Sequence, residues 1–250
     1  MLFTLENQKG KFLTITFYYI HGVWQLVDQE KIHNQCLSND PKERIHALEE
    51  FKIYFSSMPD KQQAWNDLHK LTYDQDRSVR SEAASALGFR FSDVPDKQQA
   101  WNDLHRLTND QDRSVRSEAA SALGFGFSDV PDKQQAWNDL HRLTNDQDRS
   151  VRSEAVSVLG SVFSDMPDKQ QAWNDLHRLT NDDEYSSVRE SAAKALGSNF
   201  YQVPDKQQAW NDLVRLTNCA SWHRSLWGER SNAAKALSYA FSQVPDKQQA

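Results

Sequence analysis

This chain of 250 residues contains few cysteines and no long apolar run, and each shortage excludes a class of protein. Its two cysteines, Cys36 and Cys219, are too few for a disulfide framework or a cysteine-rich zinc site, and they favour a reduced, cytoplasmic setting. The most apolar stretch, Phe12 to Ile20, is about half as long as the roughly 18 residues that a membrane span requires. No A-x-A-like cleavage site follows it, so the sequence predicts neither a membrane protein nor a secreted one.

An excess of basic residues is also missing. The formal net charge is −6, with 29 lysines and arginines against 35 aspartates and glutamates. A nucleic-acid-binding domain normally carries a basic patch or stripe, and no basic run occurs here. The composition therefore predicts no nucleic-acid partner.

What the chain does contain is a repeat that begins with PDKQQA. The motif starts at residues 59, 95, 131, 167, 204 and 245, so the period is 36 or 37 residues until the last step of 41. A fixed period of this length predicts a solenoid or a propeller. The predicted domains are a non-repeat segment, 1–38, and a repeat array, 39–250. The expected units are 39–58 (partial), 59–94, 95–130, 131–166, 167–203, 204–244 and 245–250 (truncated).

Each unit reads as two helices, and residues 95–130 serve as the example. Pro95 is expected to open the first helix, and Asp112 is expected to be the N-cap of the second. Apolar residues recur at helical spacing in both, and we expect them to be buried: Ala100, Trp101, Leu104, Leu107, Val115, Ala119, Ala122 and Leu123. Asp103 lies off the first stripe. One tryptophan per unit is expected to be structural and to pack in the core: Trp65, Trp101, Trp137, Trp173 and Trp210.

The segment DQDRSVRSEAASALG, Asp110 to Gly124, resembles the HEAT repeat of the phycobilin-lyase-like type. The resemblance extends over about 39–250 and implies an all-α, right-handed α-α superhelix whose second helices line the concave side. It also implies a ladder between repeats, in which Asp112 and its equivalents would pair with Arg116 and its equivalents. Helix capping with solvated charge is the alternative for these residues.

No motif of catalysis or metal binding is evident. Four histidines recur on the first helices, at 69, 105, 141 and 177. Packed helices lie about 8–10 Å apart, whereas zinc ligands lie about 2 Å from the ion, so one histidine per repeat does not converge on a metal. We expect ordinary helix-surface histidines and predict no metal, no cofactor and no catalytic residue. The chain also lacks the His-Glu pairs of iron-binding HEAT-like enzymes.

Differences between the copies suggest where a partner binds. If the face opposite the buried stripe of the second helices is concave, it carries Ser81 with Ser85, Ser117 with Ser121 and Ser153 with Ser157 in the earlier units. Charged residues follow in the later units at Glu190, Lys194 and Lys235. Such a groove suits an extended peptide or a helix of a partner. Neutral drift on an exposed face is the alternative.

The last full unit has a longer segment between its helices, NCASWHRSLWGER, Asn218 to Arg230. Trp222, His223, Arg224 and Trp227 are candidate partner-binding residues, because tryptophan and arginine are favoured interface anchors. One tryptophan could instead fold back onto the core.

The two ends differ from the repeats. Residues 1–38 are expected to cap the array, with a hairpin around Lys9-Gly10 as one interpretation and a helix from Trp24 to Leu37. The start of a further unit at Pro245 suggests a fragment of a longer array, with self-association through its uncapped C-terminal end.

These observations favour a non-enzymatic scaffold that binds a protein or peptide partner along the solenoid. The alternatives are an enzyme or enzyme subunit of the HEAT-like lyase type, and a regulatory array of a larger protein.

Overall fold

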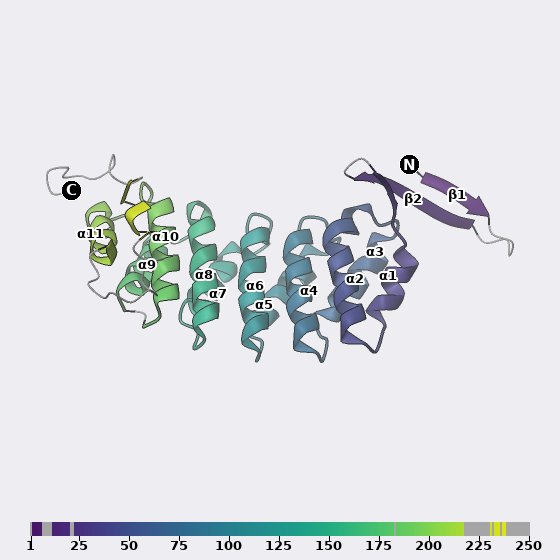
Figure 1. Cartoon of the computed structure of the whole chain (residues 1–250), viewed down its shortest axis with the longest axis horizontal. Helices are drawn as coiled ribbons and strands as arrows, with labels where there is room; N and C mark the ends of the chain where they lie inside the picture. Colours follow the sequence, from purple (N-terminus) through teal and green to yellow (C-terminus); the bar gives the residue numbers. More distant parts are fainter. Residues whose placement is uncertain are drawn as a thin grey trace.

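The computed structural model describes residues 2–6, 12–20, 23–182, 184–217, 231, 233–235 and 237–238. Within these residues the repeats form an all-α solenoid, as predicted, in which first and second helices alternate along two rows (Figure 1). The first helices are α3 (Lys61–Leu71), α5 (Lys97–Leu107), α7 (Lys133–Leu143), α9 (Lys169–Asp182) and α11 (Lys206–Thr217). The second helices are α2 (Pro41–Tyr54), α4 (Arg77–Arg90), α6 (Arg113–Gly126), α8 (Arg149–Ser161) and α10 (Ser186–Ser198). Helix α1 (Gln29–Cys36) precedes α2, and short 3-10 turns lie at η1 (Phe55–Ser57) and η2 (Phe163–Asp165).

An aspartate begins both helices of the unit. Asp96 accepts a hydrogen bond from the Gln99 amide at 2.9 Å, so α5 starts after Asp96 and not at Pro95, where it was expected. Asp112 is the N-cap of α6 and accepts from the amide of Ser114 at 2.8 Å. The carboxylate satisfies one of the orphan amides of the first turn, and this fixes where each helix starts.

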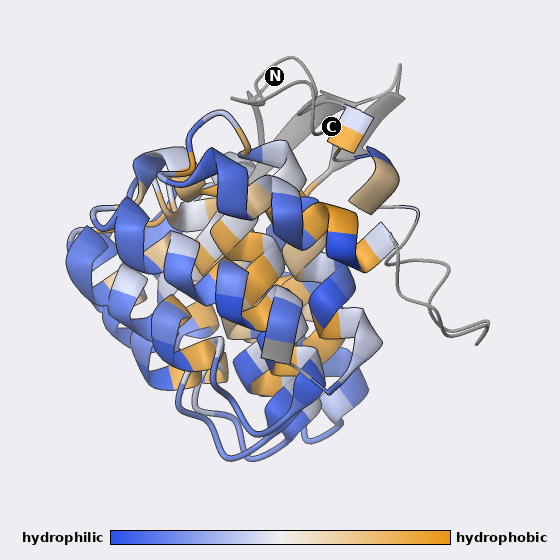
Figure 2. Cartoon of the chain, turned by 90° about the vertical axis from the view of Figure 1, so that its left-hand side faces the viewer, coloured by the Kyte–Doolittle hydropathy of each residue, from blue (hydrophilic) through white to orange (hydrophobic). Residues whose placement is uncertain are grey.

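The core fills the space between the two rows. The repeated tryptophans are at most 6 % exposed, and the apolar residues on the inner side of the second helices, such as Val79, Ala83 and Leu87 on α4, are fully buried beside them. Figure 2, which looks along the array, shows hydrophobic residues gathered between the rows and hydrophilic ones on the outside. The alternation of apolar and polar positions at helical spacing therefore builds one continuous core through all described units.

A ladder of His–Asp pairs joins successive first helices. In each pair a half-exposed histidine Nδ1 contacts the carboxylate of a buried aspartate in the next unit. The pairs are His33–Asp67 at 2.8 Å, His69–Asp103 at 2.5 Å, and His105–Asp139, His141–Asp175 and His177–Asp212 at 2.6 Å. One expectation was wrong here, because the histidines are not ordinary surface residues. Asp103, which lies off the predicted stripe, is fully buried because the next repeat covers the side of the helix on which it lies.

A second ladder joins the loops that precede the second helices. Arg80 binds both carboxylate oxygens of Asp110, at 2.7 and 3.0 Å, and Arg116 binds Asp146 at 2.7 and 2.9 Å. The expected partner of this ladder, Asp112, instead caps its own helix and accepts from Arg77 at 3.0 Å. The ladder of arginines therefore uses the aspartate two residues earlier than predicted. The pKa of Asp112 is lowered, above all by the hydrogen bond from Arg77.

Glycine and alanine allow the second helices to approach one another closely. A Cβ atom added to Gly88 would lie 2.6 Å from the Cα of Ala122, and one added to Gly160 would lie 2.9 Å from the Cα of Ala195. Neighbouring second helices are consequently packed more tightly than neighbouring first helices. The expected position of the second helices on the concave side stays a prediction.

The N-terminal segment forms a three-stranded antiparallel sheet of β1 (Leu2–Glu6), β2 (Phe12–Ile20) and β3 (Val23–Leu26) in the order β1-β2-β3. The predicted turn at Lys9-Gly10 lies outside the described residues. The predicted helix from Trp24 was wrong at its start. Trp24 pairs with Tyr19 in the sheet, and α1 begins only after Asp28, whose side chain accepts from the amide of Lys31.

Candidate partner-binding surface

The exposed side of the second helices presents the same positions once per repeat, and we call it the second-helix face. On α4 these positions are Ser78, Ser81, Glu82 and Phe89, which recur 36 residues later on α6. Spacings of three, four and seven residues place them on one side of a helix. The opposite side of the same helices, with Val79, Ala83 and Leu87 on α4, is buried in the core.

Two exposed phenylalanines stack on this face. Phe89 is 51 % exposed and Phe125 is 56 % exposed, and their ring centroids lie 4.5 Å apart. Ile53 occupies the same position on α2 and is 57 % exposed. Among the described residues of the later repeats Ser161 and Ser198 stand there, so in this part of the chain the apolar stripe is confined to α2, α4 and α6.

Sequence reasoning missed this stripe, although a signal was present. Phe89 and Phe125 lie two residues after the buried leucines, Leu87 and Leu123, and therefore off the buried side of their helices. A large apolar side chain at such a position, repeated in adjacent units, predicts a contiguous exposed patch.

Of the serines expected to line an open groove, Ser157 is exposed, whereas Ser81 and Ser121 are half-buried. Ser117 and Ser153 are half-buried. The Ser153 hydroxyl lies 2.8 Å from the Ser191 hydroxyl of the next second helix. Ser85, expected on the open face, is buried. Close helix packing explains this difference, because a small hydroxyl next to Gly and Ala positions is covered by the neighbouring helix.

The charged candidates lie toward the C-terminal end. Lys194 on α10 is exposed and Glu190 is half-buried, while Lys235 is exposed in the short described segment that follows α11. The four candidates between the helices of the last full unit lie outside the described residues: Trp222, His223, Arg224 and Trp227. The structure thus brings together Ser153 and its neighbouring serines but leaves the charged candidates apart from the aromatic stripe.

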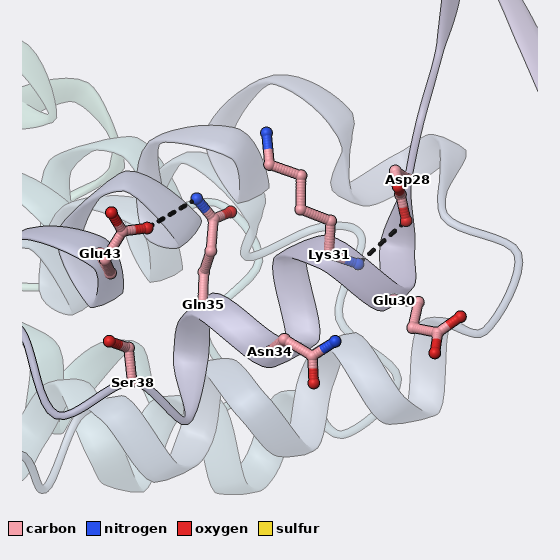
Figure 3. A pocket seen from close by; sticks show the side chains of 7 residues that line it. All are labelled: Asp28, Glu30, Lys31, Asn34, Gln35, Ser38 and Glu43. Atoms are coloured by element: carbon pink, nitrogen blue, oxygen red, sulfur yellow. Dashed lines mark hydrogen bonds between the residues drawn. The ribbon is translucent and has the colours of Figure 1, made fainter.

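An open polar hollow lies beside α1, at the other end of the array. Figure 3 shows its lining residues, which are Asp28, Glu30, Lys31, Asn34, Gln35, Ser38 and Glu43. Several of these groups bind one another: Asp28 caps α1, and the Gln35 amide donates to Glu43 at 3.1 Å. The oxygen of the Gln35 side-chain amide is nevertheless buried and accepts no hydrogen bond within the described residues.

Two further searches cover only the described part of the chain. Within it, no three side chains of His, Cys, Asp or Glu converge as metal ligands would. None of its helices combines the length and the apolar character needed to cross a bilayer.

Comparison with known proteins agrees with the helix pairs and their stacking. The family model of HEAT repeats matches residues 31–124 and 102–197, which together span most of the array. The chain belongs to the HEAT-repeat family. No curated protein matches it.

Solved structures share the HEAT-like solenoid. An engineered protein of a structural genomics consortium is 23 % identical, with a TM-score of 0.55 over 86 % of this chain and 97 % of its own. A designed armadillo repeat protein in complex with the peptide (KR)4 is also 23 % identical, with a TM-score of 0.57 over 85 % and 99 %. Kap121p bound to Ste12p is 14 % identical, with a TM-score of 0.63 over 84 % of this chain and 23 % of Kap121p.

Proposed function

We propose that this HEAT-repeat chain is a non-enzymatic scaffold that binds an extended segment of a partner protein along its second-helix face. The observation that carries the proposal is the exposed stack of Phe89 on Phe125, continued by Ile53. Contiguous apolar surface rimmed by polar residues is typical of interaction sites, and aromatic side chains are favoured anchors.

The solenoid fold, which other proteins share, supports this proposal. A solenoid presents one long surface to which each repeat adds a step, and this geometry suits a ligand in extended conformation. Two structures with a similar fold are complexes, one with the peptide (KR)4 and one with Ste12p.

Several finer features belong to the same proposal. The charged residues Glu190, Lys194 and Lys235 would extend the contact toward the C-terminus, and Trp222 with Trp227 would provide a second anchor. The motif DQDRSVRSEAASALG supports the phycobilin-lyase-like subtype of repeat without its activity. A cytoplasmic location and self-association through the C-terminal end remain parts of the proposal.

Site-specific cross-linking tests the proposal. A photo-reactive benzoylphenylalanine replaces Phe125 in one variant and the exposed Asn102 of α5, on the other row of helices, in a matched control. After irradiation in native cell extract, we expect a cross-linked protein from position 125 and none from position 102. Equal cross-linking from both positions, or none from 125, would contradict the proposed surface.

A second pair of variants separates the two anchors. Phe125→Ser introduces the residue that the chain itself carries at Ser161, so the helix is expected to tolerate it. Trp222→Ser with Trp227→Ser removes the other anchor. Loss of the partner with the first variant alone would place the main contact on the aromatic stripe, and loss with the second alone would move it to the C-terminal segment.

A further inference from the structure

The first step between second helices contains an ion pair that the following steps lack. Lys52 of α2 reaches across to α4, where its Nζ lies 2.5 Å from Oε1 of Glu82 and 5.6 Å from the ring centroid of Phe89. A carboxylate and the face of an aromatic ring together hold one ammonium group. Both attract a cation, the carboxylate by its charge and the ring by its quadrupole.

The next helix, α6, carries an equivalent glutamate and phenylalanine, and we call such a pair a corner. The residue equivalent to Lys52 is not a lysine there. Glu118 and Phe125 stand 36 residues after Glu82 and Phe89, and Gly88 stands in the position of Lys52. Glycine is required there, since a Cβ atom would lie 2.6 Å from the Cα of Ala122. The close packing of α4 on α6 therefore leaves no room for a lysine at residue 88. Glu118 and Phe125, the equivalents of the two residues that contact Lys52, are nevertheless present.

Glu118 is left without a partner as a result. It is half-buried, and among the described residues its carboxylate makes no ion pair or hydrogen bond. Phe125 beside it is 56 % exposed. Phe89 covers one face of the Phe125 ring, so a cation from solvent would contact Glu118 and the uncovered part of that ring.

The carboxylate recurs once more along the array. Glu154 of α8 has Gly124 in the position of the lysine, and it also lacks a partner within the described residues. Ser161 replaces the phenylalanine, so this position offers a carboxylate without a ring. The two unpaired carboxylates are one repeat apart on the same face.

We propose that the partner segment carries a lysine or arginine whose cation occupies the Glu118–Phe125 corner, with a second basic residue three positions away at Glu154. This inference rests on the proposed function and names the chemistry of the ligand. Three residues of extended chain span about 10 Å, which matches the roughly 8–10 Å between packed helices. The net charge of −6 favours the approach of a basic segment.

Fluorescence anisotropy with defined peptides tests the inference. The probes are labelled twelve-residue peptides with Lys, Arg, Gln or Glu at every third position and Leu and Ser between. We expect the Lys and Arg peptides to bind at least about tenfold more tightly than the Gln peptide. Glu118→Gln should weaken binding of the Lys peptide by about tenfold, and Phe125→Ser by about fivefold.

Two further variants sharpen the test. Glu30→Gln on α1, outside the second-helix face, should leave the affinity for the Lys peptide unchanged. Lys52→Ala should free the Glu82–Phe89 corner and tighten binding of the Lys peptide by about threefold or more, as a second subsite opens. Circular dichroism and thermal melting of each variant establish that the helices are retained.

The outcomes separate this inference from the proposed function. Tight binding of Gln and Lys peptides alike would overturn the basic ligand and leave the scaffold standing. Equal loss with Glu30→Gln and Glu118→Gln would overturn the assignment to the Glu118 corner. Binding of none of the peptides would overturn both proposals. Sedimentation of the chain alone adds a last outcome: a dimer abolished by Glu118→Gln would assign the corner to a second copy.

Discussion

The two rows of helices are joined in different ways. Successive first helices meet through polar pairs such as His105–Asp139, in which the aspartate is buried and the histidine half-exposed. Successive second helices meet through Gly and Ala, with backbones close enough to exclude a Cβ at Gly88. On the first row the hydrogen-bonded pairs lie between the helices, whereas on the second row they lie at the helix starts and Gly and Ala form the contact between the helices.

This difference has a consequence for the surface of each row. On the first row the histidine and aspartate side chains of the ladder pair with each other, so these groups are not available to a partner. On the second row the close packing leaves room only for a glycine, Gly88, at the position equivalent to Lys52. The Glu118 carboxylate therefore has no ion-pair partner among the described residues. This difference is the reason why we propose the second-helix face as the surface for a partner.

The largest expected effect comes from breaking a polar pair of the first row. His105→Val introduces the residue found at Val214 and leaves the Asp139 carboxylate without its closest partner. We expect the free energy of unfolding to fall by about 3 kcal/mol, because a buried charge loses its compensation. Urea denaturation followed by circular dichroism measures the change. The double variant His105→Val with Asp139→Leu should recover most of the loss, and a double variant as unstable as the single one would contradict this explanation.

Substitution of glycine tests the second row. Gly88→Ala should lower the free energy of unfolding by about 2 kcal/mol, since α4 and α6 must separate to admit the Cβ. Gly124→Ala is the matched control: its Cβ would meet the Val158 side chain at 3.1 Å, not a backbone. We expect about zero net change there, because the gain in helix propensity offsets the contact. Equal losses at both sites, in the same denaturation experiment, would count against packing by backbone approach.

A smaller effect is expected at the helix start that also contacts the preceding repeat. Asp112→Ala removes the cap of α6 and the ion pair with Arg77, and should cost about 1 kcal/mol. Asp96→Ala removes a cap with no such pair and should cost a few tenths of a kcal/mol less. Thermal unfolding of the two variants measures their losses of stability. A larger loss for Asp96→Ala than for Asp112→Ala would contradict the expected contribution of the Arg77 ion pair.

The smallest effect is the response to acid, which should have opposite sign at two aspartates. Burial raises the pKa of Asp175, whereas the hydrogen bond from Arg77 lowers the pKa of Asp112. Asp175 thus contributes stability below its unfolded pKa of about 3.9 and loses that contribution as the pH rises through its folded pKa. Asp112 contributes above about pH 3.9 and loses its contribution as the pH falls through its lowered pKa.

Carboxyl carbon NMR measures these titrations directly. As the pH falls from 7, Asp175 should become protonated before Asp112. In the Arg77→Gln variant the titration of Asp112 should move up toward its ordinary range while that of Asp175 stays in place. The same order of protonation with no response to Arg77→Gln would assign the low pKa of Asp112 to the helix cap alone.

Much of the fold could be predicted from the repeated segment. The spacing of Trp101, Leu104 and Leu107 predicted the first helix, and Asp112 followed by Val115 and Ala119 predicted the start and the core of the second. These features are local, because helical periodicity and capping depend on residues within two or three turns. The division of the chain into units stays a prediction, as does the role of Trp222 and Trp227.

The candidate site was much less predictable. Ser117 and Ser153 were expected on an open face but are half-buried, and the aromatic stripe of Phe89 and Phe125 was not anticipated. Which polar residue is covered depends on the distance to the next second helix. This distance cannot be inferred from the sequence of a single unit.

By itself, the sequence determined a helical pair, its period and its apolar sides, because each follows from interactions within one repeat. The tertiary structure alone decided which residues of adjacent repeats meet: His105 with Asp139, Arg116 with Asp146, Lys52 with Glu82. Among the described residues it also left Glu118 without such a partner, since α4 and α6 approach too closely at Gly88 for any side chain to fit there.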